Sequence, residues 1–394
     1  MLNILFFLIL GFIPSLSAEV GFYEPSTNDF PEKVVQTADK IFRLFVYLDT
    51  PLVVSEVNYK KIIDRDEIDP FSKKLISSYN DKLNNGKHVI PFLDSCSAII
   101  LTTIKDTAML LTAAHCFDDA VKIMESISKN IDNIDADRLP ATHFRFREVK
   151  KQIIVTNFKN EIVYDSTDRQ ATVTFRTYSN FVFLPYLFKS LVTFSAIKAF
   201  DLENKRKTFE PLEFLNQQAF VALKDFAVLT LANTGTAFQG KSLNWSQLEG
   251  DQEIYSAGYP AKLSQSVKRP RGIDPSGEKL FYGKGKNVLI DTYFQKFNEK
   301  VKKQSGKDFK LNVEDEKRLR GLYSETMILT DSDCSGAMSG GPLLNSSGNI
   351  IGIITGGFPD SQSLNPTFGA RCIGVPADKV IEAINVSDKF KNTQ

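Results

Sequence analysis

Short apolar runs separated by turn residues are the feature of this chain that most limits its fold. The runs are rich in β-branched and aromatic residues, which is typical of β-strands. No internal repeat of fixed period is present. The sequence therefore predicts a mainly β protein with short antiparallel strands. The runs are HVIPFL (88–93), SAIILTT (97–103), AMLLTA (108–113), KQIIVTNF (151–158), IVYD (162–165), ATVTFRTY (171–178), FAVLTL (226–231) and NIIGIITGG (349–357).

Composition excludes several functional classes. The chain has 394 residues, enough for one large domain or two ordinary ones. Hydrophobic residues make up 42% and charged residues 24%, as in ordinary globular proteins. The formal net charge of +1 provides no general attraction for nucleic acid, membranes or acidic substrates. We therefore expect no nucleic-acid partner, and composition leaves the oligomeric state open.

The first residues are typical of a secretory signal peptide. The apolar stretch Leu2–Ile13 is too short to span a bilayer, and the small residues Ser15, Ser17 and Ala18 follow it. We expect residues 1–18 to be removed, which predicts a secreted or periplasmic protein without stable membrane insertion. The n-region has no Lys or Arg, so a membrane anchor remains the alternative.

Four cysteines, Cys96, Cys116, Cys334 and Cys372, fit two disulfides in an oxidising compartment. Three pairings can be drawn, and proximity in the sequence favours Cys96–Cys116 and Cys334–Cys372. None of them forms a C-x-x-C pair, and the chain has only three histidines. This argues against a structural zinc site, and we expect no metal and no cofactor.

The segment CSGAMSGGPLL (334–344) carries a candidate nucleophile. Ser339 precedes Gly340 and Gly341, and such glycines allow a sharp turn that exposes a serine. Backbone N–H groups of such a turn can also bind a developing oxyanion. The alternative is a plain glycine-rich hairpin turn.

A serine needs a base, and histidine is the usual one at neutral pH. His88 follows NNGK and fits a loop, and His143 fits a surface position. His115 follows an apolar run and precedes a cysteine, so it is the best candidate, although such a histidine can also be structural. Asp225, at the head of FAVLTL, can orient it, or can be a simple turn residue.

The order His115, Asp225, Ser339 completes a resemblance to the trypsin/chymotrypsin-like serine protease family. The matching motifs are CSAII with LTAAHC, DFAVLTL, YSAGYPA, MSGGPLL, NIIGIITGG and IGVPADKVIEAI. In that family a disulfide joins the strand cysteine to the one after the histidine, which corresponds to Cys96 and Cys116. The GYP sequence and Met338 before the serine are similar to bacterial-type members.

The resemblance implies an all-β fold of two antiparallel six-stranded β-barrels, with helical insertions and a C-terminal helix. It places the peptidase domain at 88–390, with insertions at about 117–215 and 262–330. Residues 19–87 are an N-terminal extension or propeptide, or they supply the first strands. Within the insertions, we expect a helix in 117–139 and charged helical structure in 291–323, which is a solvated excursion or a lid over the cleft. The apolar segment 179–194 covers a barrel or contacts a partner.

The resemblance also implies the roles of site residues. Ser339 is the nucleophile, His115 the general base and Asp225 its orienting acid, and the backbone N–H groups of Ala337 and Ser339 form the oxyanion hole. Many family members have Gly and Asp where this chain has Ala337 and Met338. Met338 cannot pair with a new N-terminal amine, and no Ile-Val-Gly-Gly start is present upstream of Cys96. The usual activation switch is therefore expected to be missing.

The resemblance locates a substrate pocket but leaves its register open. Cys334 lies one residue further from the serine than is usual in the family. Counting from the serine puts Asp333 at the pocket base, which favours Lys or Arg side chains, and counting from the cysteine puts Ser332 there, which favours apolar ones. We lean toward basic side chains, and the alternative is that Asp333 is a solvated loop charge. The expected walls are Thr355, Gly356, Gly357 and Gly374.

The function that this resemblance implies is a secreted serine endopeptidase that acts on proteins or peptides through an acyl-enzyme. The alternative is a catalytically inactive pseudoprotease that acts as a binding module, because Met338 and the shifted Cys334 depart from the family pattern. An α/β-hydrolase esterase is excluded, since that fold expects G-x-S-x-G and the order serine, acid, histidine.

Overall fold

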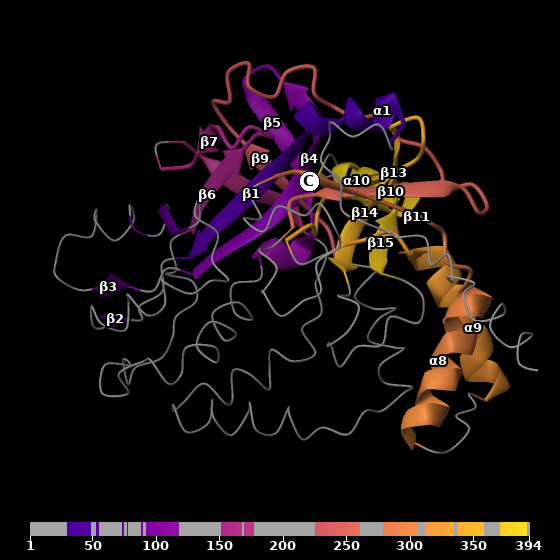
Figure 1. Cartoon of the computed structure of the whole chain (residues 1–394). Coiled ribbons are helices and arrows are strands. Elements are labelled where there is room, and N and C mark those ends of the chain that lie inside the picture. Colours follow the sequence, from indigo (N-terminus) through magenta and orange to yellow (C-terminus); the bar gives the residue numbers. More distant parts are fainter. Residues whose placement is uncertain are drawn as a thin grey trace, which may run out of the picture.

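Two antiparallel β-sheets make up the core of the computed structural model (Figure 1). Within the residues that the structure describes, the sheets have seven and six strands, and few helices accompany them. The predicted chymotrypsin-like pair of β-barrels is therefore confirmed. The structure describes residues 30–48, 53–54, 73–74, 77, 88–89, 92–117, 151–167, 169–176, 225–260, 279–305, 312–334, 337–357 and 371–391.

The first sheet has the strand order β7-β6-β1-β4-β5-β9-β8. Apolar side chains alternate along its strands, so one face of β1 and β4 lines the hydrophobic core of this sheet. The six strands that the resemblance implied are too few for this sheet, which has seven. Strand β1 was not among the apolar runs of the sequence. The strands are β1 (Ile41–Leu48), β4 (Phe92–Ile104), β5 (Thr107–Thr112), β6 (Lys151–Thr156), β7 (Ile162–Asp165), β8 (Ala171–Arg176) and β9 (Ala227–Leu231).

The second sheet has the order β11-β10-β13-β14-β15-β12. Its two edge strands approach each other, because the N–H of Val288 donates to the carbonyl of Leu329 at 2.7 Å and the N–H of Asp331 to that of Lys286 at 3.2 Å. These bonds curl the sheet toward a closed barrel. The strands are β10 (Glu253–Gly258), β11 (Phe281–Lys286), β12 (Ile328–Thr330), β13 (Pro342–Leu344), β14 (Ile350–Gly357) and β15 (Cys372–Pro376).

The N-terminal segment joins both sheets. Strand β1 lies between β4 and β6 in the first sheet. Before it, α1 (Glu32–Val35) and the 3₁₀ turn η1 (Ala38–Lys40) pack on the second sheet. The Phe30 ring lies 5.8 Å from that of Tyr255, and the Thr37 hydroxyl is 3.0 Å from that of Tyr282. Part of the range 19–87 is thus built into the sheets.

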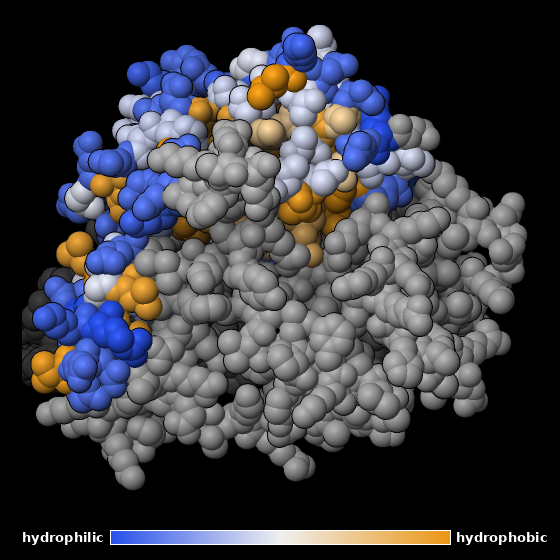
Figure 2. Space-filling model, turned by 180° about the vertical axis from the view of Figure 1, so that it is seen from behind, coloured by the Kyte–Doolittle hydropathy of each residue, from blue (hydrophilic) through white to orange (hydrophobic). Residues whose placement is uncertain are grey.

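Two helices, α8 (Ile290–Ser305) and α9 (Val313–Thr326), extend from the second sheet (Figure 1). They cover most of the charged segment 291–323 for which helical structure was predicted, and α9 ends three residues beyond it. An aromatic cluster between them fixes the pair, with the rings of Tyr293 and Tyr323 5.5 Å apart. The Asn312 side chain caps α9 by accepting from the N–H of Asp315. Figure 2 shows this pair at its lower left, mostly hydrophilic with single hydrophobic residues.

The last helix, α10 (Ala377–Lys391), follows β15 and packs on β14 and β15, as expected for a C-terminal helix. Short elements complete the description: β2 (Val53–Val54) pairs with β3 (His88–Val89), and η2 (Ala114–Phe117) follows β5. No helix within the described ranges has the length and apolarity needed to cross a membrane. The expectations for residues 1–18, 118–139, 179–194 and His143 lie outside the described residues.

Candidate active site

His115 and Asp225 meet between strand ends of the first sheet. His115 lies in the turn η2 that follows β5, and Asp225 lies two residues before the start of β9, which pairs with β5. The Nδ1 atom of His115 is 2.7 Å from Oδ2 of Asp225, and the backbone N–H of His115 donates to Oδ1 at 2.9 Å. Asp225 is thus held at both oxygens and its side chain is only 3% exposed.

This contact determines what the imidazole ring can do. An ionised carboxylate only accepts hydrogen bonds, so a neutral His115 ring carries its proton on Nδ1 and keeps a lone pair on Nε2. The His115 side chain is 38% exposed, so part of the ring is accessible. The backbone contact fixes the carboxylate relative to His115, and the contact at Nδ1 then restricts rotation of the ring. The pair therefore has the tautomer and the access that a general base requires.

The two disulfides form at the predicted pairing. Cys96 on β4 bonds to Cys116, next to His115, with a Cα–Cα distance of 6.3 Å. Cys334 bonds to Cys372 at the start of β15, with a Cα–Cα distance of 5.3 Å. Because the sulfur atoms of Cys96 and Cys116 are bonded to each other, the group Cys96, His115 and Cys116 offers no thiolate to a metal ion.

Ser339 lies in the turn that leads into β13. The turn is anchored by the N–H of Gly340, which donates to the carbonyl of Ile354 at 2.7 Å, and by that of Gly341, which donates to Met338 at 2.9 Å. Gly340 has a φ of 86°, which glycine adopts without strain. Ser339 is buried, with 6% of the residue exposed. Its hydroxyl lies 3.5 Å from the Thr355 carbonyl.

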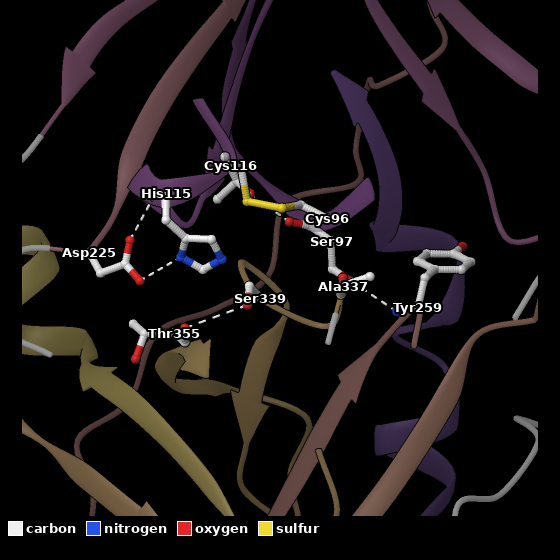
Figure 3. The surroundings of a disulfide bond; sticks show 10 residues. Cys96, Ser97, His115, Cys116, Asp225, Tyr259, Ala337, Ser339 and Thr355 are labelled. Carbon is white, nitrogen blue, oxygen red and sulfur yellow. Dashed lines mark hydrogen bonds and ion pairs between the residues drawn. A yellow bond between two sulfur atoms is a disulfide. The ribbon is translucent and has the colours of Figure 1, made fainter. Parts of the chain in front are cut away.

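Ser339 and His115 are connected through the first disulfide. The N–H of Ser97 donates to the carbonyl of Ser339 at 2.8 Å. Ser97 is bonded to Cys96, Cys96 to Cys116, and Cys116 to His115. In Figure 3 the imidazole ring of His115 is directed toward Ser339, with Asp225 on its other side. The structure thus brings the three sequence-predicted residues to one place between the two sheets.

Ala337, the other candidate oxyanion donor, has an unusual backbone. Its φ is 68°, in the left-handed region that favours glycine. For alanine this conformation costs about 1–2 kcal/mol. Many family members have glycine at this position, and the structure shows why: the turn requires a left-handed conformation that glycine adopts without strain.

The candidate pocket base contains an ion pair. The guanidinium Nη1 of Arg371 lies 2.6 Å from Oδ1 of Asp333, and these side chains are 29% and 10% exposed. The carboxylate considered as a partner for substrate is therefore already paired within the chain. Ser332, the other candidate, is fully buried. Its backbone lies against Gly285, where an added side chain would come within 2.2 Å of the Ser332 nitrogen.

The expected pocket walls fall into two groups. A side chain at Gly356 would meet no atom of the described residues within 4 Å. Gly374 is packed, with Leu343 and the Ile353 carbonyl each within 3 Å of where its side chain would be. Its missing side chain serves the contact between strands and leaves no space for substrate. Thr355 donates its hydroxyl to the Ile373 carbonyl at 3.2 Å, and Gly357 pairs with Cys372.

Sequence reasoning missed three residues that shape the site. They are Ser97, which contacts the nucleophile turn, Thr112, which donates to the Ser97 carbonyl at 2.7 Å, and Arg371. Serine and threonine within strands have no recognisable pattern. Arg371 stands next to Cys372, and only the Cys334–Cys372 disulfide indicated that it lies near Asp333.

Three solved structures match the chain at low identity and with low TM-scores. Two are of the HtrA-type protease AlgW with a decapeptide, with TM-scores of 0.40 and 0.38 and 14% identity, over 92% and 90% of this chain and 67% and 65% of theirs. The third, the serine endoprotease from Yersinia pestis, has a TM-score of 0.37 and 12% identity, over 91% of this chain and 66% of that one. The chain thus spans about two thirds of their length. No curated protein matches the sequence.

The family comparison is more specific. The model of the trypsin-like peptidase domain matches residues 96–353, well over half of the chain. This range begins at the first disulfide cysteine and includes His115, Asp225 and Ser339. The protein therefore belongs to the trypsin-like serine protease family.

Proposed function

We propose that this protein is a serine endopeptidase that hydrolyses peptide bonds through His115, Asp225 and Ser339. The observation that carries the proposal is the two-point contact of Asp225 with His115, at 2.7 and 2.9 Å, on the side of the ring away from Ser339. A carboxylate in that position orients the base and stabilises its charged form. A structural histidine would not need both contacts and an exposed ring.

The proposed reaction is acyl transfer to water. Nε2 of His115 takes the proton of the Ser339 hydroxyl while the oxygen attacks the peptide carbonyl, and the proton then passes to the leaving amine. Water repeats the sequence on the acyl-enzyme. The backbone N–H groups of Ala337 and Ser339 stabilise the oxyanion, and each such donor contributes roughly 3 kcal/mol to the barrier reduction. Proteins and peptides are the proposed substrates.

One observation favours the second candidate, a pseudoprotease that binds without turnover. The Ser339 hydroxyl is within 3.5 Å of the Thr355 carbonyl, a contact that competes with donation to His115. A contact of this length is weak, so a small rotation about the Ser339 side chain releases it. The two candidates make opposite predictions for the reactivity of Ser339.

We also propose that the protein acts outside the reducing cytosol, and that residues 30–48 remain in the mature enzyme. Two disulfides are typical of exported proteins. Removal of β1 would leave β4 and β6 without their shared neighbour, which argues against loss of the segment as a propeptide.

Labelling with a fluorophosphonate probe tests the proposal. The purified protein should be labelled, and Ser339→Ala, His115→Ala and Asp225→Asn variants should lose most or all of the label. Thr174→Ala is a matched control, because this hydroxyl contacts Thr230 on the first sheet away from the site. A folded wild-type protein that takes up no label would refute the endopeptidase and support the binding module.

A further inference from the structure

Ser97 on β4 makes an unusual number of contacts for one small residue. It is fully buried. Its backbone N–H donates to the carbonyl of Ser339 at 2.8 Å, and its hydroxyl donates to the carbonyl of Ala337 at 3.1 Å. The same hydroxyl accepts from the N–H of Tyr259 at 2.9 Å. A residue of the first sheet thus binds both the nucleophile turn and the end of β10 in the second sheet (Figure 3).

The two bonds from Ser97 bracket one peptide group. The carbonyls of Ala337 and Ser339 lie on either side of the Met338–Ser339 amide, whose N–H is the candidate oxyanion donor. With both neighbouring carbonyls held by one rigid strand residue, this amide has little freedom to rotate. The Ser97 hydroxyl also binds the carbonyl of the strained residue, Ala337, whose φ is 68°.

Neighbouring glycines make room for this arrangement. A side chain at Gly258 would come within 2.7 Å of the Ser97 hydroxyl and 3.2 Å of the Met338 backbone. A side chain at Gly340 would come within 2.2 Å of both the Ser97 carbonyl and the Thr112 hydroxyl. Glycine at both positions therefore lets the turn approach Ser97 closely enough for direct hydrogen bonds.

We propose that the Ser97 hydroxyl is a positioning group that holds Ala337 in its left-handed conformation and thereby keeps the oxyanion-binding amides in place. The effect on catalysis rests on the proposed function, whereas the effect on the turn does not. In Ser97→Ala, the Ala337 carbonyl loses its partner and the strained turn can relax. Glycine at 337 has no such strain, so Ala337→Gly should compensate for the lost hydroxyl.

The experiment compares four proteins expressed from the full sequence: wild type, Ser97→Ala, Ser97→Ala with Ala337→Gly, and Thr37→Val. Thr37 is the matched control, because its buried hydroxyl also has two partners but lies on the second sheet away from the turn. Two quantities are measured. One is the second-order rate of fluorophosphonate labelling, and the other is hydrogen exchange in the peptide that contains Met338–Gly341.

We expect Ser97→Ala to reduce the labelling rate on the order of 10²-fold, as misplaced catalytic groups do. Adding Ala337→Gly to this variant should raise its labelling rate roughly tenfold, which corresponds to the strain removed at position 337. Exchange of the turn amides should rise in Ser97→Ala and remain as in wild type in Thr37→Val. If wild type takes no label, the proposed function fails, and turn exchange alone then tests the role of Ser97.

Three results would overturn the inference. The first is unchanged exchange of the turn in Ser97→Ala. The second is faster hydrogen exchange over the whole Ser97→Ala protein, to the same extent as in Thr37→Val. Such a result would indicate that the Ser97 hydroxyl only contributes to general stability. The third, in a protein that takes label, is a Ser97→Ala variant that reacts at the wild-type rate or gains nothing from Ala337→Gly.

Discussion

Replacing Arg371 by glutamine should destabilise the protein more than replacing Asp333 by asparagine. The pair is joined at 2.6 Å, but the Asp333 side chain is 10% exposed and that of Arg371 is 29% exposed. Without Arg371 the largely buried carboxylate loses this ion pair, and such losses cost about 3 kcal/mol. Without Asp333 the guanidinium can still reach water, so the loss is closer to that of one charged hydrogen bond, about 1.5 kcal/mol.

Urea unfolding of the two variants and of the double variant measures these values. We expect the double variant to be less destabilised than the sum of the two single ones, with a coupling energy of about 1 kcal/mol or more. The reasoning is refuted if Asp333→Asn is the more destabilised single variant. It is also refuted if the two effects simply add, because the ion pair would then contribute nothing.

The same substitution tests the substrate pocket. With Arg371 in place, Asp333 is neutralised and offers little attraction to a basic substrate side chain. Arg371→Gln should therefore raise kcat/KM for peptides with lysine or arginine before the cleaved bond, relative to leucine, by about tenfold or more, since one unscreened charge in a protected site supplies several kcal/mol. Asp333→Asn with Arg371→Gln is the control. An unchanged ratio would show that Asp333 does not face the bound side chain.

Three further predictions concern stability. A chain that starts at Thr50 lacks β1 and should be insoluble or unfolded by circular dichroism, and a folded product would contradict the role of β1. Replacing Cys96 and Cys116 by alanine opens a loop of 20 residues and should lower the free energy of unfolding by about 3 kcal/mol in urea; a loss below 1 kcal/mol would contradict this. Burial raises the pKa of Tyr259 above its ordinary 10.0, so stability should fall as the pH rises beyond 10.0, and Tyr259→Phe should flatten that fall in alkaline urea titrations.

Local patterns in the sequence predicted much of the fold. The run AMLLTA and its neighbours became strands because alternating apolar side chains suit a half-buried pleated surface. Strand β1 was not among the apolar runs, although first strands within residues 19–87 were one of the alternatives that the resemblance left open. Its sequence, IFRLFVYL, contains Arg43, a charge that local reasoning assigns to an exposed position. The folded protein buries Arg43 almost completely, and the ring of Phe45 lies 4.5 Å from its guanidinium.

The sequence by itself determined the residues that this site contains: a histidine next to a disulfide cysteine, an acid before a strand and a serine within a glycine turn, in the family order. Their contacts were decided by tertiary structure, because His115 and Asp225 are 110 positions apart and approach only when β5 pairs with β9. The same holds for Asp333 with Arg371 and for Ser97 with Ala337. Hydrogen bonds between distant segments leave no periodic trace in a sequence, since one serine or arginine in a strand or loop looks like any other until the sheets pack.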